Sequence, residues 1–267
     1  MPVNNAALNV ALVQKAASLE PAENRAALDV VGTIVARAEE PLDLVVFPEV
    51  FMRDFGKPGS DIAAFAEELD GPFVSRLTEL AKEHAVTLVA GLFERSSDPA
   101  RPYNTVVVVD RDGLRASYRK IHLYDSFGYK ESDRLLAGDI EPLVVDLAGM
   151  SVGFMTCYDL RFPELAREIT LRGAELLVVP AAWVAGPAKV DHWRTLVRAR
   201  AIENTVYVAA CAQPGPRYSG HTMLVDPRGE VLAEAETEGD TVVTGTVERD
   251  VIGSAREENP SLQNRRF

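Results

Sequence analysis

Three residues with side chains capable of covalent and acid–base chemistry each stand directly after a run that is typical of a strand. Glu49 follows residues 44–48, Lys120 follows residues 114–119 and Cys157 follows residues 152–156. In layered α/β folds, reactive groups gather where strands end and loops begin. We therefore expect a carboxylate, an ammonium and a thiol to converge on one pocket.

The three groups have complementary chemical roles. A free thiol has a pKa of about 8.5, so a nucleophilic cysteine needs a nearby base. Glu49 lies after an apolar run and before Val50 and Phe51, which predicts a poorly hydrated carboxylate suited to exchanging a proton with the thiol. Lys120 can donate to a developing oxyanion, together with the backbone N–H of Tyr158.

The other cysteine and the histidines suggest no further chemistry. Cys211 lies inside the apolar stretch 206–212, which favours a small core residue, and two cysteines do not make a disulfide framework. The histidines show no zinc-type spacing, and no protease-type sequence surrounds Cys157. We expect no metal and no organic cofactor. The histidines are His84, His122, His192 and His221.

Composition narrows the class of protein. The 267 residues are 47% hydrophobic and carry a formal charge of −12, so the chain can bury a sizeable core and should be repelled by nucleic acids and anionic membranes. The N-terminus lacks a basic segment ahead of an apolar stretch, and the apolar runs are far below transmembrane length. We expect a soluble cytoplasmic protein.

Short apolar runs alternate with amphipathic stretches, which predicts an α/β layered fold. Residues 44–47 and 176–179 are apolar at every position, as expected for strands covered on both faces. Residues 122–139 are expected to form a long loop, and 248–267 show no strong core pattern. Helices are predicted at 21–40, 72–84, 163–172 and 189–203, and strands at 8–13, 42–47, 87–93, 103–109, 114–120, 143–147, 151–156, 176–180, 206–212 and 241–247.

The segments around the three reactive residues resemble the signature segments of the nitrilase superfamily of carbon–nitrogen hydrolases. These segments are 47–51, 118–125 and 157–165, and the resemblance extends over about 9–247. It implies an α/β fold, a four-layer αββα sandwich. It also implies one carbon–nitrogen hydrolase domain over 1–267, a homodimer or higher homo-oligomer, and a C-terminal tail 248–267 at a subunit interface.

The resemblance also implies roles for individual residues. Glu49 would be the general base and acid, Lys120 the stabiliser of the oxyanion, and Cys157 the nucleophile that forms a thioester. Many members carry a second glutamate after the lysine loop, and Glu131 fits that place, although a solvated loop carboxylate is the alternative. The loop before Glu131 is shorter than in the ω-amidase-like branch.

The sequence after the cysteine, 157–163, looks like the branch of ω-amidases and deaminated-glutathione amidases. It implies a thiol amidase that hydrolyses a small linear amide to a carboxylate and ammonia. The alternative is another carbon–nitrogen bond, in a nitrile or an N-carbamoyl amino acid, cleaved by the same triad. A non-enzymatic scaffold would predict decay of the triad, and the triad is intact.

Four further side chains are candidates for lining the substrate pocket. Arg161 could grip a substrate carboxylate through two parallel hydrogen bonds. Each of the four could equally serve packing or a dimer interface. The candidates are Tyr124, Phe127, Arg161 and Trp183.

Overall fold

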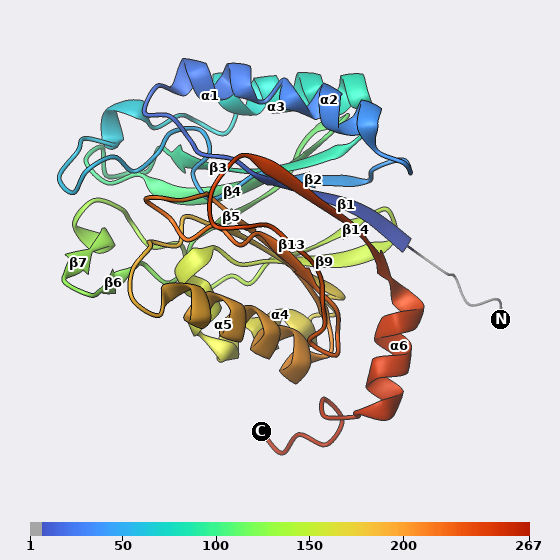
Figure 1. Ribbon diagram of the computed structural model, residues 1–267. Coiled ribbons are helices and arrows are strands. Elements are labelled where there is room, and N and C mark those ends of the chain that lie inside the picture. Colours follow the sequence, from blue (N-terminus) through green and yellow to red (C-terminus); the bar gives the residue numbers. More distant parts are fainter. Residues whose placement is uncertain (1–6) are drawn as a thin grey trace.

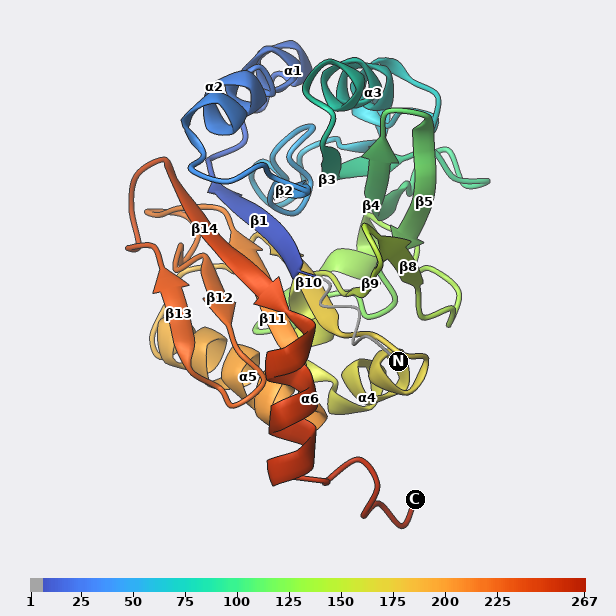
Figure 2. The same cartoon turned by 90° about the vertical axis from the view of Figure 1, so that its right-hand side faces the viewer.

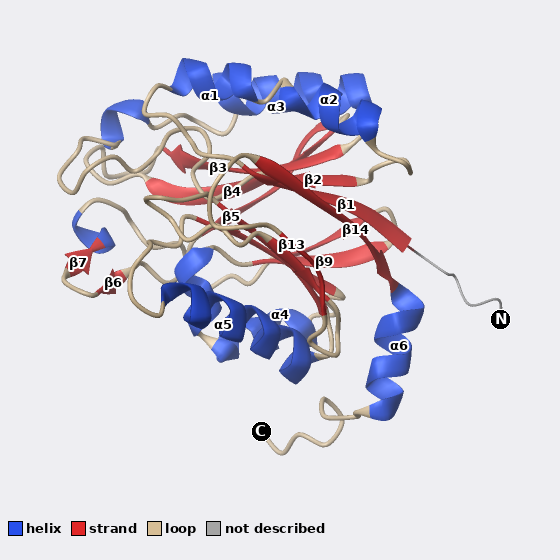
Figure 3. Cartoon of the chain, in the orientation of Figure 1, coloured by secondary structure: helices blue, strands red, loops and turns tan. Residues whose placement is uncertain are grey.

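The computed structural model describes residues 7–267 and contains two stacked six-stranded sheets with helices on both outer faces (Figure 1, Figure 3). The predicted four-layer αββα sandwich is therefore confirmed. Residues 1–6, which include the start of the expected domain, lie outside the described residues.

The first sheet contains the first and the last strand of the described chain, β1 and β14. Its strands β1, β2 and β3 run parallel, and β14, β4 and β5 join them in antiparallel pairs. In spatial order the strands are β14 (Thr241–Glu248), β1 (Ala7–Gln14), β2 (Leu44–Val46), β3 (Thr87–Glu94), β4 (Tyr103–Asp110) and β5 (Gly113–Arg119).

The second sheet has the same plan. Its central strands β9, β10 and β11 run parallel, and antiparallel strands flank them on both sides. In spatial order the strands are β13 (Val231–Glu234), β12 (Met223–Val225), β11 (Tyr207–Ala212), β10 (Leu176–Ala181), β9 (Met150–Phe154) and β8 (Val144–Leu147).

Helices close each sheet on its outer side. The first sheet is covered by α1 (Pro21–Ala27), α2 (Val30–Arg37) and α3 (Pro72–His84), and the second by α4 (Pro163–Leu171) and α5 (Lys189–Asn204). The expected loop 122–139 contains a small hairpin, β6 (Asp125–Ser126) and β7 (Tyr129–Lys130). This hairpin and α6 (Arg249–Glu258) lie at opposite ends of the sandwich (Figure 1), and α6 faces the viewer in Figure 2.

The apolar strands contribute side chains to three separate hydrophobic cores, because successive side chains of a strand point to opposite faces of its sheet. In β2, Leu44 and Val46 pack between the sheets, whereas Val45 packs under the helices of the first sheet. In β10, Val178 enters the core between the sheets and Leu177 the core under α4 and α5. Burial on both faces explains why these strands are apolar at every position.

The prediction of one continuous helix over residues 21–40 is wrong. The helical segment divides into α1 and α2 at Leu28 and Asp29, where backbone bonds three residues apart replace the α-helical pattern. It also ends at Arg37, before Glu40, and Pro41 disfavours helical backbone at the residue before it. A short interruption of this kind leaves the hydrophobic periodicity almost unchanged.

The chain continues beyond residue 247, the end of the expected resemblance, into a packed helix. Residues 249–258 form α6, whose Ile252 and Ala255 are buried and spaced to share one helix face. Ile252 packs into the core between the sheets. Two buried apolar residues are too weak a pattern to predict a helix from sequence.

We predict that Ile252→Ala lowers the free energy of unfolding by about 2–4 kcal/mol, because it removes a branched side chain from a closed core. Ile140→Ala is the matched control, since Ile140 is 84% exposed. Urea denaturation measures both. Equal losses in the two variants would contradict the docking of α6 on the core.

Candidate functional site

Glu49 lies in a tight turn that follows β2 and packs against β3. Val50, the next residue, has a φ of 45°, and the N–H of Met52 donates to the carbonyl of Gly91 at 3.0 Å. A Cβ at Gly91 would lie 2.3 Å from the nitrogen of Val50, so only glycine permits this approach. The turn fixes the position from which the Glu49 side chain starts.

The Glu49 carboxylate is almost fully buried and held by hydrogen bonds on both oxygens. Oε1 accepts from Nδ2 of Asn104 at 2.8 Å and from Nζ of Lys120 at 2.9 Å. Oε2 accepts from the backbone N–H of Ala182 at 2.7 Å. These bonds stabilise the buried carboxylate and fix its orientation. The predicted poor hydration of Glu49 agrees with its exposure of 1%.

Lys120 directly follows β5 and is held at both its backbone and its side chain. Its N–H donates to the carbonyl of Asn104 at 2.8 Å, and Nζ lies 2.9 Å from Oε1 of Glu49 and 3.0 Å from Oε2 of Glu131. Burial disfavours the charge of Lys120, but the Glu131 and Glu49 carboxylates outweigh it and raise the pKa of the ammonium above its usual value. Lys120 therefore stays charged.

Glu131 begins the short 3₁₀ helix η2 (Glu131–Asp133), and its side chain is buried rather than solvated. Its Oε2 also accepts from the backbone N–H of Tyr124 at 2.6 Å. Burial raises the pKa of Glu131, and the positive charge of Lys120 opposes that effect. The alternative of a solvated loop carboxylate is excluded by this position.

Cys157 begins the 3₁₀ helix η3 (Cys157–Arg161) with a φ of 48°, in the left-handed region that non-glycine residues rarely adopt. Burial raises the pKa of its thiol, the negative charge of Glu49 raises it further, and Lys120 works against both. The resting site therefore contains a neutral thiol close to a carboxylate. Such a pair favours proton transfer over a preformed thiolate.

A further buried carboxylate, that of Asp159, joins the segment of Lys120 to that of Cys157. It accepts from the Tyr118 hydroxyl at 2.7 Å, from the backbone N–H of His122 at 3.0 Å and from the backbone N–H of Thr156 at 2.9 Å. Nδ1 of His122 lies 2.8 Å from the same carboxylate. Asp159 thus links the two sheets beside the reactive groups.

A cavity of about 520 Å³ opens onto these groups. Its volume is in the range typical of small-molecule sites. The structure brings every residue that the sequence analysis singled out for a site into its lining: Glu49, Lys120, Tyr124, Phe127, Glu131, Cys157, Tyr158, Arg161 and Trp183.

Lys189, which the sequence analysis missed, enters the same cavity from the start of α5. Its Nζ lies 3.8 Å from the centre of the Phe127 ring and donates to the Tyr124 hydroxyl at 3.2 Å. Burial lowers the pKa of Lys189, and the charge of Arg161 lowers it further. Lys189 is the first residue of a polar helix, and nothing in the neighbouring sequence indicates that its side chain lines a cavity.

Arg161 lies in the same group of aromatic rings. Its guanidinium carbon is 4.8 Å from the centre of the Trp183 ring, and its buried Nε has no hydrogen-bond partner within residues 7–267. One terminal nitrogen of Arg161 lies 3.4 Å from Nδ1 of His192. The cavity therefore has a wall of aromatic rings with two cations among them.

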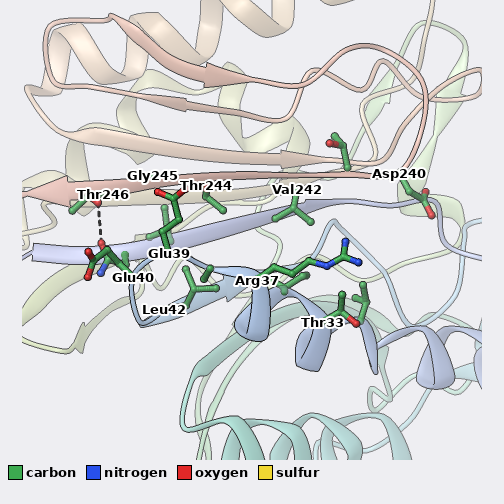
Figure 4. A pocket seen from close by; sticks show the side chains of 16 residues that line it. Thr33, Arg37, Glu39, Glu40, Leu42, Asp240, Val242, Thr244, Gly245 and Thr246 are labelled. Carbon is green, nitrogen blue, oxygen red and sulfur yellow. Dashed lines mark hydrogen bonds between the residues drawn. The ribbon is translucent and has the colours of Figure 1, made fainter.

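A larger groove of about 720 Å³ lies between α2 and β14 (Figure 4). Its charged residues Arg37, Glu39, Glu40 and Asp240 are exposed, and no thiol lines it. We therefore do not assign chemistry to this groove.

Residues 7–267 lack two features that would point to other functions. No cluster of three or more histidine, cysteine or acidic side chains that could hold a metal ion was found there. In the same part of the chain, none of the helices combines the length and the apolar character needed to cross a membrane.

The sequence matches a family model and curated proteins over most of its length. The model for carbon–nitrogen hydrolases matches residues 9–257. A deaminated glutathione amidase of Escherichia coli O157:H7 is 38% identical over 241 residues, which is 90% of this chain and 91% of that protein.

Solved structures of the same family share the fold of this chain. The nitrilase-superfamily member Nit3 of Saccharomyces cerevisiae is 30% identical, with a TM-score of 0.85 and coverage of 98% and 97% of the two chains. A mutant amidase from Nesterenkonia, with the acetamide moiety of fluoroacetamide added covalently at its active-site cysteine, is 28% identical, with a TM-score of 0.80 and coverage of 97% and 94%. The chain belongs to the carbon–nitrogen hydrolase family, in the amidase branch of the nitrilase superfamily, and is an enzyme that hydrolyses carbon–nitrogen bonds.

Proposed function

We propose that this enzyme is a thiol amidase in which Glu49, Lys120 and Cys157 form the catalytic triad. The observation that carries the proposal is the buried ion pair of 2.9 Å between Lys120 and Glu49, in one cavity with Cys157. A base, a cation and a thiol around one cavity are the groups that acyl transfer requires.

In the acylation half, Glu49 takes the proton of the Cys157 thiol while the sulfur attacks the amide carbonyl. A carbon–sulfur bond forms, and the carbonyl oxygen becomes an oxyanion. Lys120 and the backbone N–H of Tyr158 donate to that oxyanion. The left-handed backbone of Cys157, followed by a 3₁₀ turn, favours a concave arrangement of successive N–H groups that suits an anion.

The intermediate then collapses to a thioester. The carbon–nitrogen bond breaks, and ammonia leaves with the proton that Glu49 took from the thiol. In the second half, Glu49 takes a proton from water, the water oxygen attacks the thioester, and the thiol of Cys157 is restored with that proton. The carbon–sulfur bond breaks, and the acid that leaves ionises in water, where ammonia takes up its proton. The final products are a carboxylate and ammonium, and no net proton is left on the enzyme.

Glu131 acts in this scheme as the residue that positions Lys120. Its carboxylate lies 3.0 Å from Nζ and is itself fixed by the N–H of Tyr124. With two carboxylates around one ammonium, Lys120 is oriented before substrate binds, which lowers the cost of reorganisation during the reaction.

We assign Arg161 to the acyl part of the substrate. Its guanidinium lines the cavity beside Trp183, and no carboxylate within residues 7–267 forms an ion pair with it. A guanidinium in a partly apolar cavity is well suited to bind a carboxylate. This arrangement favours small linear amides with an acid group at the far end.

A homodimer or higher homo-oligomer, the interface role of residues near the C-terminus and a cytoplasmic location stay predictions. Size-exclusion chromatography with light scattering would measure the oligomeric state.

We predict that Cys157→Ala abolishes ammonia release from succinamate and that Glu49→Gln lowers kcat by about 10²–10⁴-fold. Both variants keep the cavity, so circular dichroism should remain that of the wild type. Cys211→Ala is the matched control, because Cys211 lies in the core between the sheets. Turnover by Cys157→Ala above the uncatalysed rate would contradict a thioester mechanism.

We predict that iodoacetamide labels Cys157 and leaves Cys211 unlabelled in the folded enzyme. Cys157 lines the cavity, whereas Cys211 is fully buried and burial raises the pKa of its thiol far above the usual range. Because the pKa of Cys157 is also raised, its labelling rate should climb from about pH 6 to about pH 9 without levelling off. Mass spectrometry follows both sites, and a plateau near neutral pH would indicate a preformed thiolate instead.

We predict that Arg161→Met raises KM for succinamate by about 10–100-fold, because a charge-assisted hydrogen bond to the substrate is lost. The KM for butyramide, which has no carboxylate, should change little. Steady-state assays of ammonia release from the two amides distinguish a role in binding the carboxylate from a role in packing. A similar change in KM for both substrates would assign Arg161 to packing of the cavity wall.

A further inference from the structure

Asn104 contacts both the base and the cation of the proposed triad. Its side chain is fully buried, and its Nδ2 donates to Oε1 of Glu49 at 2.8 Å. Its backbone carbonyl accepts from the N–H of Lys120, also at 2.8 Å. The side chain of one residue therefore holds Glu49, while the main chain of the same residue holds Lys120.

The position of Asn104 in the first sheet accounts for this double contact. Glu49 lies in the turn after β2, Lys120 follows β5, and the strands β3 and β4 lie between them. Asn104 is the second residue of β4 and pairs with Phe93 of β3. Neighbouring strands are about 4.8 Å apart, so β2 and β5 are separated by about 14 Å. A residue on an intervening strand is placed to bridge this distance.

The hydrogen bonds of Glu49 leave one acceptor position of its carboxylate open. Each carboxylate oxygen has two lone pairs. Oε1 accepts from Asn104 at 2.8 Å and from Nζ of Lys120 at 2.9 Å, so both of its lone pairs are used. Within residues 7–267, the one nitrogen that donates to Oε2 is the backbone N–H of Ala182, at 2.7 Å. The free lone pair of the carboxylate is therefore on Oε2.

We propose that Asn104 is a positioning residue that directs the proton of Cys157 to Oε2 of Glu49. During attack, the sulfur–hydrogen bond of Cys157 breaks as an oxygen–hydrogen bond forms at Oε2 and the carbon–sulfur bond forms. When the carbon–nitrogen bond breaks, the same proton passes from Oε2 to the leaving nitrogen. The inference rests on the proposed function, since it concerns the base of the same triad.

Proton uptake at Oε2 leaves the hydrogen bonds around Glu49 intact. Oε1 becomes the carbonyl oxygen of a neutral carboxyl group and still accepts from Asn104 and Lys120. A proton on Oε1 would have to displace one of these two donors. Donors that need not rearrange while the proton moves lower the barrier of the step.

The amide of Asn104 also prevents the carboxyl group of Glu49 from turning. The terminal torsion of a glutamate is broad, so contacts must fix the plane of its carboxyl group. A reversed amide would place Oδ1 of Asn104, an acceptor, against Oε1. In the observed orientation this Oδ1 is buried and has no hydrogen-bond partner within residues 7–267. An unsatisfied buried atom lowers stability, which indicates that Asn104 serves the site rather than the fold.

The first test is Asn104→Leu, which keeps a similar side-chain volume, removes the donor and leaves the backbone bond to Lys120 in place. We expect kcat for succinamate to fall about 10–100-fold, because a charge-assisted hydrogen bond is lost. The KM should stay within about twofold of the wild type, since Asn104 does not line the cavity. Asn104→Ala, which adds no bulk, should lose kcat to a similar extent and replaces the leucine variant if that variant does not fold.

A second test combines Asn104→Leu with Glu49→Gln. Two residues that act through one another have effects that are not additive. In the Glu49→Gln background, Asn104→Leu should therefore change kcat by less than about threefold, because the base through which Asn104 acts has been removed. A merely structural role would lower kcat by the same factor in both backgrounds. Ammonia release is followed at enzyme concentrations that make the residual rate of Glu49→Gln measurable.

Asn204→Leu is the matched control. Asn204 is also fully buried, and its Nδ2 donates to the carbonyl of Arg200 at 2.9 Å. Its Oδ1 likewise has no hydrogen-bond partner in the described part of the chain, but the residue lies at the end of α5, outside the cavity lining. The kcat of this variant should equal that of the wild type. Circular dichroism verifies that each variant is folded.

A wild-type kcat in folded Asn104→Leu would overturn the inference. So would equal losses of kcat in the two backgrounds, or a rise in KM as large as the fall in kcat. Failure of the proposed function has a different signature. In that case Glu49→Gln would itself keep the kcat of the wild type, or the wild type would release no ammonia from succinamate and butyramide alike.

Discussion

The buried ammonium of Lys120 is the constraint around which the site is arranged. A charge taken out of water must be paired and hydrogen-bonded, or the fold loses several kcal/mol. Here Glu49 comes from the turn after β2, Glu131 from η2, and Lys120 from the end of β5. Ala182, at the end of β10 in the other sheet, completes the coordination of Glu49. Because these partners come from both sheets, pairing this one charge fixes how the sheets meet at that end.

The nucleophile is tied to the chain on both sides of Lys120 through the carboxylate of Asp159. That carboxylate contacts residues on either side of Lys120 and the residue before Cys157, so the cation and the sulfur cannot shift independently. This restraint also explains how the protein tolerates unfavourable backbone conformations. Val50 and Cys157 both have positive φ, and such residues persist only where the surroundings determine the conformation. The strain lies beside the two groups between which a proton must move.

Patterns that are local in sequence made part of this arrangement predictable. The strands covered on both faces are apolar at every position, and Glu49, Lys120 and Cys157 follow such runs or their neighbours, so the sandwich and the convergence could be anticipated. Asn104 and Ala182 could not, because their contacts with Glu49 span 55 and 133 residues. Asn104 lies at an ordinary position of β4, and Ala182 directly follows β10. Lys189 was missed for the same reason. The division of the first helix leaves hydrophobic periodicity almost unchanged, and the docking of α6 rests on only two buried apolar residues.

The acyl wall of the cavity is positively charged, whereas the whole chain carries a net negative charge. The chain has a formal charge of −12, yet Lys189 and Arg161 give the acyl wall two positive charges that no carboxylate within residues 7–267 pairs. At physiological ionic strength, interactions between exposed charges are screened over about 8 Å, so the acidic surface contributes little inside a cavity. Recognition of an acidic amide therefore depends on short-range contacts in a partly dry space, where the interaction between charges is stronger than in water.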